Sequence, residues 1–219
     1  MTVARLSDGA LWVHSPIDLD ADTKAAVDEL GPVKHIISPN YEHVKWAQQW
    51  IDAYPEAVAW ACPGAKEKFP DISFTKEIGW KAPEEWLGEI DSAWFDCEKN
   101  PFTGTPFFNE VVFYHKPSKV MMCADLWWNW PSKVPGGTRA WKFGMDQVYR
   151  PFYLNLMADS RRLKRDAQKM LDWDFDCLLP CHGRVVADEV IAPELKMDDE
   201  LYAAWGGDLK GLLKDHLKL

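Results

Sequence analysis

Short apolar runs alternate with helical patterns along residues 1–70. Runs of this length bounded by turn residues are typical of buried strands, and they occur at residues 2–6, 10–16, 33–37 and 57–61. Between them, apolar residues spaced three and four apart predict helices at about residues 22–30 and 41–53, and a short one ending near Phe69-Pro70. This alternation of strands and helices is typical of an α/β fold.

A hairpin follows in the middle of the chain. Residues 110–114 and 119–124 predict two strands joined by a polar turn, and the second strand leads directly to Asp125. Further short strands are expected at residues 72–74, 93–96 and 177–179, with a helix at residues 159–171. The pattern predicts two sheets between layers of helices. The length favours one domain over residues 1–219, with a C-terminal helical tail from about residue 195.

Three polar segments directly follow predicted buried strands. They are Ser38-Pro39-Asn40-Tyr41-Glu42-His43, Cys123-Ala124-Asp125 and Pro180-Cys181-His182-Gly183. Strand ends are where open α/β sheets usually hold ligands. Carboxylates and imidazoles converging there suit zinc, iron or manganese. The alternative is that each His or Asp only makes structural hydrogen bonds at the end of its strand.

The order of these segments resembles the metallo-β-lactamase superfamily. In that family an H-x-H-x-D-H motif follows a buried strand, an Asp ends a later hairpin, and a His lies in a late G-H-G-like turn. Here 82 residues separate His43 from Asp125 and 57 separate Asp125 from His182, and the resemblance covers roughly residues 2–190. The sequences S-P-N-x-x-H, C-A-D and P-C-H-G resemble a branch of the superfamily, a domain of unknown function, whose members generally lack the full motif. The resemblance implies an αββα sandwich, with two mixed β-sheets between outer helices.

The resemblance also implies that one of two metal pockets is lost. The family's first metal is held by three His, and the matching positions here are Ser38, Asn40 and residues 106–109, which contain no His. The second metal is held by residues that match Glu42, His43, Asp125 and His182. These four imply one divalent metal, with zinc expected first and iron or manganese as alternatives. The remaining alternative is that no metal binds.

Composition narrows the range of partners. A net charge of -9 and a pI near 5.1 argue against a nucleic-acid binder, which needs clustered Lys and Arg. No apolar run approaches the roughly 18 residues that span a membrane. Five cysteines without a C-x-x-C pair favour a reducing compartment. We therefore expect a cytoplasmic monomer or homodimer, or an organellar protein if a transit peptide has been removed.

The leading functional hypothesis is a metal-dependent hydrolase acting on a small ester, thioester or lactone. In it, Asp125 or Glu42 orients the attacking water. We expect the substrate contacts to come from Asn40 and from the tryptophans before Pro131, which are Trp127, Trp128 and Trp130. The alternative is a non-catalytic member of the fold that binds a ligand or protein partner through this Trp-rich segment. Redox di-iron chemistry needs both metals, so the missing first pocket disfavours it.

Overall fold

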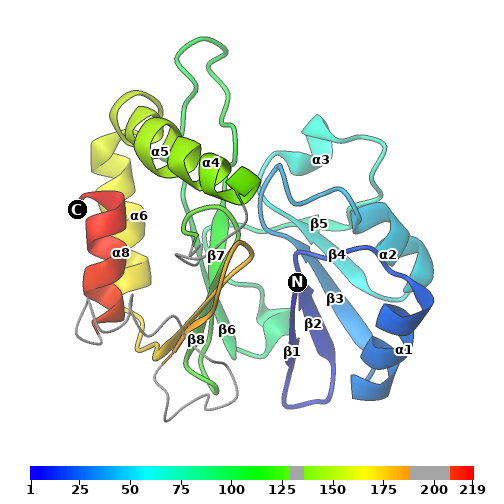
Figure 1. Cartoon of the computed structure of the whole chain (residues 1–219). Coiled ribbons are helices and arrows are strands. Elements are labelled where there is room, and N and C mark those ends of the chain that lie inside the picture. The colour runs from blue at the N-terminus through cyan, green and yellow to red at the C-terminus, as the bar shows by residue number, and fades with distance from the viewer. Residues whose placement is uncertain (129–135, 188–207) are drawn as a thin grey trace.

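The computed structural model describes residues 1–128, 136–187 and 208–219. Its first sheet is formed by the N-terminal part of the chain (Figure 1), in the order β1 (Thr2–Arg5), β2 (Leu11–His14), β3 (Val33–Ser38), β4 (Val58–Ala61) and β5 (Lys76–Glu77). The β1–β2 pair is antiparallel, and the other neighbours are parallel. Parallel pairing brings the carboxyl ends of β2, β3 and β4 to the same edge of the sheet.

The second sheet is formed by the later strands. Its order is β10 (Val186–Ala187), β9 (Cys177–Pro180), β8 (Val120–Cys123), β7 (Val111–His115) and β6 (Ile90–Trp94). Only β8 and β9 are parallel, so Asp125 and His182 follow two neighbouring strands that end at the same edge. The predicted hairpin before Asp125 is therefore confirmed.

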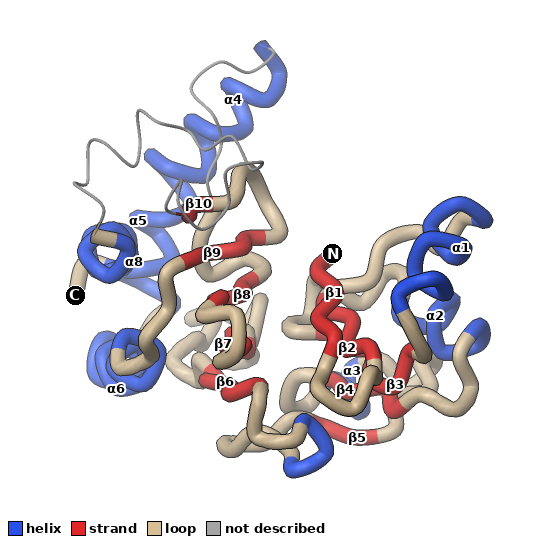
Figure 2. The backbone as a smooth tube through the Cα atoms, turned by 90° about the horizontal axis from the view of Figure 1, so that it is seen from below, coloured by secondary structure: helices blue, strands red, loops and turns tan. Residues whose placement is uncertain are grey.

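Helices cover the outer face of each sheet (Figure 2). The first sheet carries α1 (Ala21–Leu30) and α2 (Ala47–Ala53), with α3 (Ala65–Lys68) after β4, and the second carries α6 (Ser160–Leu171) and α8 (Leu209–Leu217). Between β8 and α6 lie α4 (Gly136–Gly144), α5 (Arg150–Phe152) and two π-helical segments, Met145–Tyr149 and Tyr153–Met157. A 3-10 turn, Glu84–Trp86, precedes β6. The predicted αββα sandwich of two mixed sheets is confirmed.

The alternation of side chains along β7 explains the layers. Val111 and Phe113 point toward the first sheet, where they pack with Trp12 and Ile37. Val112 and Tyr114 point the other way, into a cluster that the apolar faces of α6 and α8 complete. Because successive residues of a strand face opposite sides of the sheet, a strand that is buried on both faces has a continuous run of apolar residues in the sequence.

Two details of the predicted elements need correction. Residues 72–74 form no strand, and the strand that pairs with β4 is Lys76–Glu77. The helix expected from about residue 41 begins only at Ala47. The predicted C-terminal tail falls partly on residues 188–207, outside the described residues, while α8 packs into the core through four leucines. Among the described residues, no helix is both long and apolar enough to cross a membrane.

Candidate metal centre

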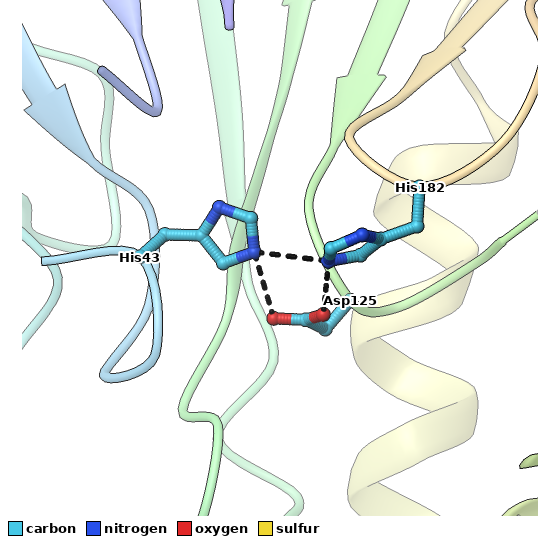
Figure 3. Close-up of side chains that lie close together, drawn as sticks. All are labelled: His43, Asp125 and His182. Atoms are coloured by element: carbon cyan, nitrogen blue, oxygen red, sulfur yellow. Dashed lines mark hydrogen bonds and ion pairs between the residues drawn. The ribbon is translucent and has the colours of Figure 1, made fainter. Parts of the chain in front are cut away.

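The turn after β3 places His43. The side-chain oxygen of Asn40 accepts hydrogen bonds from the backbone N–H groups of Glu42 and His43, at 3.0 and 2.9 Å. This local turn competes with helix formation, which explains why α2 starts late. It also directs the His43 side chain away from the first sheet and toward the ends of β8 and β9 (Figure 3).

His43, Asp125 and His182 converge on one point (Figure 3). His43 Nε2 lies 3.2 Å from Asp125 Oδ2, and His182 Nε2 lies 3.0 Å from Asp125 Oδ1. The two Nε2 atoms are 3.3 Å apart. The side chains of His43 and Asp125 are 15% and 13% exposed and that of His182 is 40% exposed, so the cluster is open on the His182 side. The predicted convergence of these three residues is confirmed.

The spacing of these donor atoms fits a divalent cation. Zinc lies about 2.0–2.2 Å from imidazole nitrogen and carboxylate oxygen, so neighbouring ligand atoms are about 2.8–3.6 Å apart, the shorter values at octahedral angles and the longer ones at tetrahedral angles. The observed separations of 3.0 to 3.3 Å fall in that range. Two imidazoles and one carboxylate are also a donor set that suits zinc or ferrous iron.

Ser15 orients the His43 ring. Its hydroxyl is hydrogen-bonded to His43 Nδ1, which leaves Nε2 facing Asp125 and His182. Ser15 follows β2 and has a φ of 53°, in the left-handed region that non-glycine residues rarely adopt. Its backbone N–H bonds to the carbonyl of Ile37 at 2.9 Å, which ties this strained residue to β3. Strain of this kind is commonly found where a side chain must be held in one orientation.

Asp125 is held by two buried side chains. Asn40 donates from Nδ2 to Asp125 Oδ2 at 2.7 Å and to Glu110 Oε2 at 3.2 Å. Glu110 accepts the backbone N–H groups of Ala124 and Asp125, at 2.7 and 2.8 Å. The pKa of Glu110 is raised, mainly by burial and then by the charge of Asp125. Glu110 was not predicted as a site residue, although a carboxylate at the start of an apolar strand is an unusual residue to bury.

The charges of the centre favour a cation. Burial acts to raise the pKa of Asp125, but hydrogen bonds from His182 and His43 outweigh it and hold that pKa below its usual value. Burial likewise acts to lower the pKa of His43, whereas its bonds to Asp125 and Cys181 raise it to about 10. For Cys181, burial is outweighed by hydrogen bonds to His14 and His43, which lower the pKa of the thiol to about 5. Asp125 and Cys181 therefore stabilise a positive charge at His43, which a divalent cation would supply in place of the ring proton.

Other predicted site residues take different places. Glu42 is exposed and is not among the side chains that converge, because the Asn40 turn directs only His43 inward. Asn40 is fully buried with its amide engaged by Asp125 and Glu110, so it supports the centre instead of facing a substrate. Trp127 is 3% exposed and packs in the core, and Trp130 lies outside the described residues.

The positions that match the family's first metal pocket offer no comparable donor set. Ser38 and Asn40 are fully buried neutral side chains. The backbone N–H groups of residues 107–109 bond to the carboxylate of Glu98, at 2.7 to 3.0 Å. Among the described residues, one group of His, Cys, Asp or Glu side chains has metal-binding spacing, and it is the His43 cluster.

A narrow pocket adjoins Asp125. Its walls include Phe108, Glu110, Trp128, Tyr149, Arg150 and His216. Its volume of about 20 Å³ is enough for one or two water molecules. Trp128 is thus the one predicted tryptophan, among the described residues, that lines a pocket beside the centre. Tyr149, Arg150 and His216 were not identified from the sequence.

Comparison with known proteins supports the fold. Residues 1–145 match a family described as "Domain of unknown function (DUF4336)". No curated protein is similar to the chain in sequence. The expected resemblance to a domain of unknown function within the metallo-β-lactamase fold is confirmed by the family match and by solved structures.

Three solved structures illustrate the likeness. The DIM-1 metallo-β-lactamase is 13% identical, with a TM-score of 0.56 over 91% of this chain and 85% of that enzyme. A metallo-β-lactamase from Pontibacter korlensis is 12% identical, with a TM-score of 0.52 over 90% and 85% of the two chains. The chemotaxis sensor ODP, solved as a peroxy diiron species, is 13% identical, with a TM-score of 0.53 over 92% and 83%. Identities this low show a shared fold and nothing finer.

Proposed function

Because the chain belongs to the DUF4336 family and has a metallo-β-lactamase fold, we propose that it is a mononuclear metal-dependent hydrolase. His43, Asp125 and His182 would hold one divalent cation, with zinc as the first candidate and ferrous iron or manganese as alternatives. One observation carries the proposal. The Nε2 atoms of His43 and His182 lie 3.3 Å apart, and each lies 3.0 or 3.2 Å from one of the two Asp125 oxygens, a spacing compatible with a single cation.

Three protein ligands leave room for catalysis. Structural zinc sites are usually closed by four protein ligands, whereas catalytic sites keep one position for water or substrate. A cation bound here would supply Lewis acidity, which polarises a carbonyl and makes water a stronger nucleophile at neutral pH. The chain's contribution is to position these groups. Ser15 fixes the His43 ring, Asn40 fixes one oxygen of Asp125, and the ionised Asp125 can accept a hydrogen bond from the attacking water.

The substrates we propose are small esters, thioesters or lactones. The pocket beside Asp125 has room for only one or two waters, so it suits one end of a small molecule better than an extended polymer. Glu42 is not needed in this scheme, since its exposed side chain lies outside the cluster.

A second candidate function follows from the same distances. The two imidazoles and Asp125 can also satisfy one another by hydrogen bonds without a cation. In that case the chain would be a non-catalytic member of the fold, and the pocket lined by Trp128 would bind a ligand or partner.

Hydrolysis assays on metal-loaded protein distinguish the two candidates. We would test 4-nitrophenyl acetate, acetylthiocholine and γ-butyrolactone after loading with zinc, iron or manganese. The proposed function predicts turnover that is lost in His182→Ala and Asp125→Asn and kept in His115→Ala, whose imidazole lies in the β7–β8 hairpin. Bound metal without turnover of any ester, thioester or lactone would favour the non-catalytic candidate.

A further inference from the structure

Two hydrogen-bond donors in the pocket beside Asp125 have no partner. The Tyr149 hydroxyl and Arg150 Nε are both buried, and neither makes a hydrogen bond. Both residues line the pocket. Leaving a buried donor unpaired is costly, about 1–3 kcal/mol and more for a charged group, so such atoms commonly mark a place where a ligand binds.

The charge of Arg150 is only partly balanced, since it lowers the pKa of nearby Asp146 without forming an ion pair with it. The Nη1 atom of Arg150 donates to His216 Nδ1 at 3.2 Å. The pKa of His216 is lowered to about 3, mainly by burial and then by the charge of Arg150, so the imidazole ring is neutral. Asp146 lies nearby but already accepts from Lys142 at 2.9 Å and from the Trp128 indole at 2.8 Å. Within residues 1–128, 136–187 and 208–219, no carboxylate forms an ion pair with Arg150. An arginine whose Nε is buried and unpaired, and which forms no ion pair, favours an anionic ligand.

The backbone fixes both donors. Tyr149 ends one π-helical segment and Arg150 begins α5, and π-helical turns occur frequently at functional sites. The Tyr149 ring packs edge-on against Phe108 at 5.8 Å, which limits where its hydroxyl can point. Burial raises the pKa of Tyr149, so its hydroxyl remains a donor at neutral pH.

We propose that this pocket binds the carboxylate group of a small organic acid, through Arg150 and the Tyr149 hydroxyl. The inference rests on the proposed hydrolase function, whose substrate class it narrows to small esters, thioesters or lactones that also bear a carboxylate. The pocket has the size of one or two waters, so it holds the carboxylate end alone. Asp125 lies in the same wall, which places the rest of the molecule over the metal centre.

The surroundings favour a single negative charge. One guanidinium supplies one positive charge, and its planar fork matches the two oxygens of a carboxylate. Asp125 and Glu110 line the same pocket and would repel a dianion such as phosphate more strongly than a monoanion. Leu126 and Leu154 add apolar surface to the same pocket, which suits the carbon that bears a carboxylate better than a fully hydrated inorganic anion.

Calorimetric titration with acetate, propionate, phosphate and sulfate tests the inference on the full chain. We expect acetate and propionate to bind more tightly than phosphate or sulfate. Tyr149→Phe removes a buried hydroxyl that has no partner in the fold, so it should keep or raise the melting temperature and weaken carboxylate binding about tenfold. Arg150→Gln should abolish binding. Arg161→Gln, which removes the same charge from an exposed position on α6, should leave it intact.

The same titrations separate this inference from the proposed function. His182→Ala removes a proposed metal ligand, and propionate should still bind to that variant through Arg150 and Tyr149. Equal affinity of wild type and Tyr149→Phe for propionate, no carboxylate binding, or tighter binding of phosphate would each overturn the inference. Any of these three results would leave the predictions of metal content and hydrolysis standing. Conversely, a protein that binds no metal or hydrolyses no substrate should still bind carboxylates in the titration.

Discussion

Asn40 donates a hydrogen bond from its side-chain amide to Asp125, 85 residues further along the chain, at 2.7 Å. Asn40 follows β3 of the first sheet, and Asp125 follows β8 of the second. The same amide reaches Glu110, and the Asn40 oxygen holds the turn that places His43. One buried side chain therefore joins the two sheets at the candidate centre and positions two of its three proposed ligands.

Removing the Asn40 amide should destabilise the fold. Asn40→Ala leaves the buried Glu110 carboxylate without one donor and removes the acceptor for the His43 N–H, so we expect a loss of about 2 kcal/mol or more in the free energy of unfolding. Urea denaturation measures it, with the exposed Asn155→Ala as the matched control. Equal stability of the two variants would show that the Asn40 network contributes little.

Two variants of Ser15 separate its effect on metal affinity from its effect on backbone strain. Ser15→Ala and Ser15→Gly both remove the hydroxyl bonded to His43 Nδ1, so each should weaken metal binding about 10- to 100-fold. The glycine variant should be about 1 kcal/mol more stable than the alanine variant, because φ is 53° at this position. Competition with a metal-sensitive dye and thermal unfolding measure the two effects. Unchanged affinity in both variants would exclude Ser15 as a positioning residue.

His216 should make the fold sensitive to acid. Burial, then the Arg150 charge, lower the pKa of His216 from 6.5 to about 3, so the unfolded chain takes up a proton at a pH where the folded chain does not. The stability that the neutral ring contributes is present above pH 6.5 and is lost as the pH falls toward 3. The free energy of unfolding should fall by up to about 1.4 kcal/mol per pH unit in this window.

Urea denaturation at pH 7, 6 and 5 measures this dependence. The His216→Gln variant should show a shallower fall than wild type, because its side chain cannot take up the proton. Burial also lowers the pKa of His115, but less than that of His216, so His115→Gln should remove a smaller part of the dependence than His216→Gln. Parallel curves for wild type and His216→Gln would show that another group is responsible.

The sequence predicts the layers and three residues of the centre for a simple physical reason. Buried strands leave short apolar runs, and the residues that follow parallel strands meet at one edge of a sheet. Asp125 and His182 follow the neighbouring parallel strands β8 and β9, so this argument brings those two together. His43 follows β3 of the other sheet, and its place beside them was expected from the resemblance to the metallo-β-lactamase fold, in which the two sheets pack face to face.

The residues that hold the proposed ligands in place could not be predicted, because they act through contacts between segments far apart in the sequence. Glu110 binds Asn40 across 70 residues of chain, and Ser15 reaches His43 across 28. Sequence patterns also miss the helices at residues 136–157, where glycines and Pro151 interrupt the chain and large apolar residues such as Trp141 are exposed. Tyr149 and Arg150 lie in this region, so the pocket that they line could not be anticipated.

Metal content of the purified chain, measured by plasma emission after incubation with zinc and removal of excess, tests the central claim most directly. The geometry predicts about one equivalent in wild type and in Glu42→Ala, because Glu42 is exposed and outside the cluster. It predicts none in His182→Ala and one in the His115→Ala control. Two equivalents in wild type, or none with zinc, iron or manganese, would contradict a mononuclear centre formed by His43, Asp125 and His182.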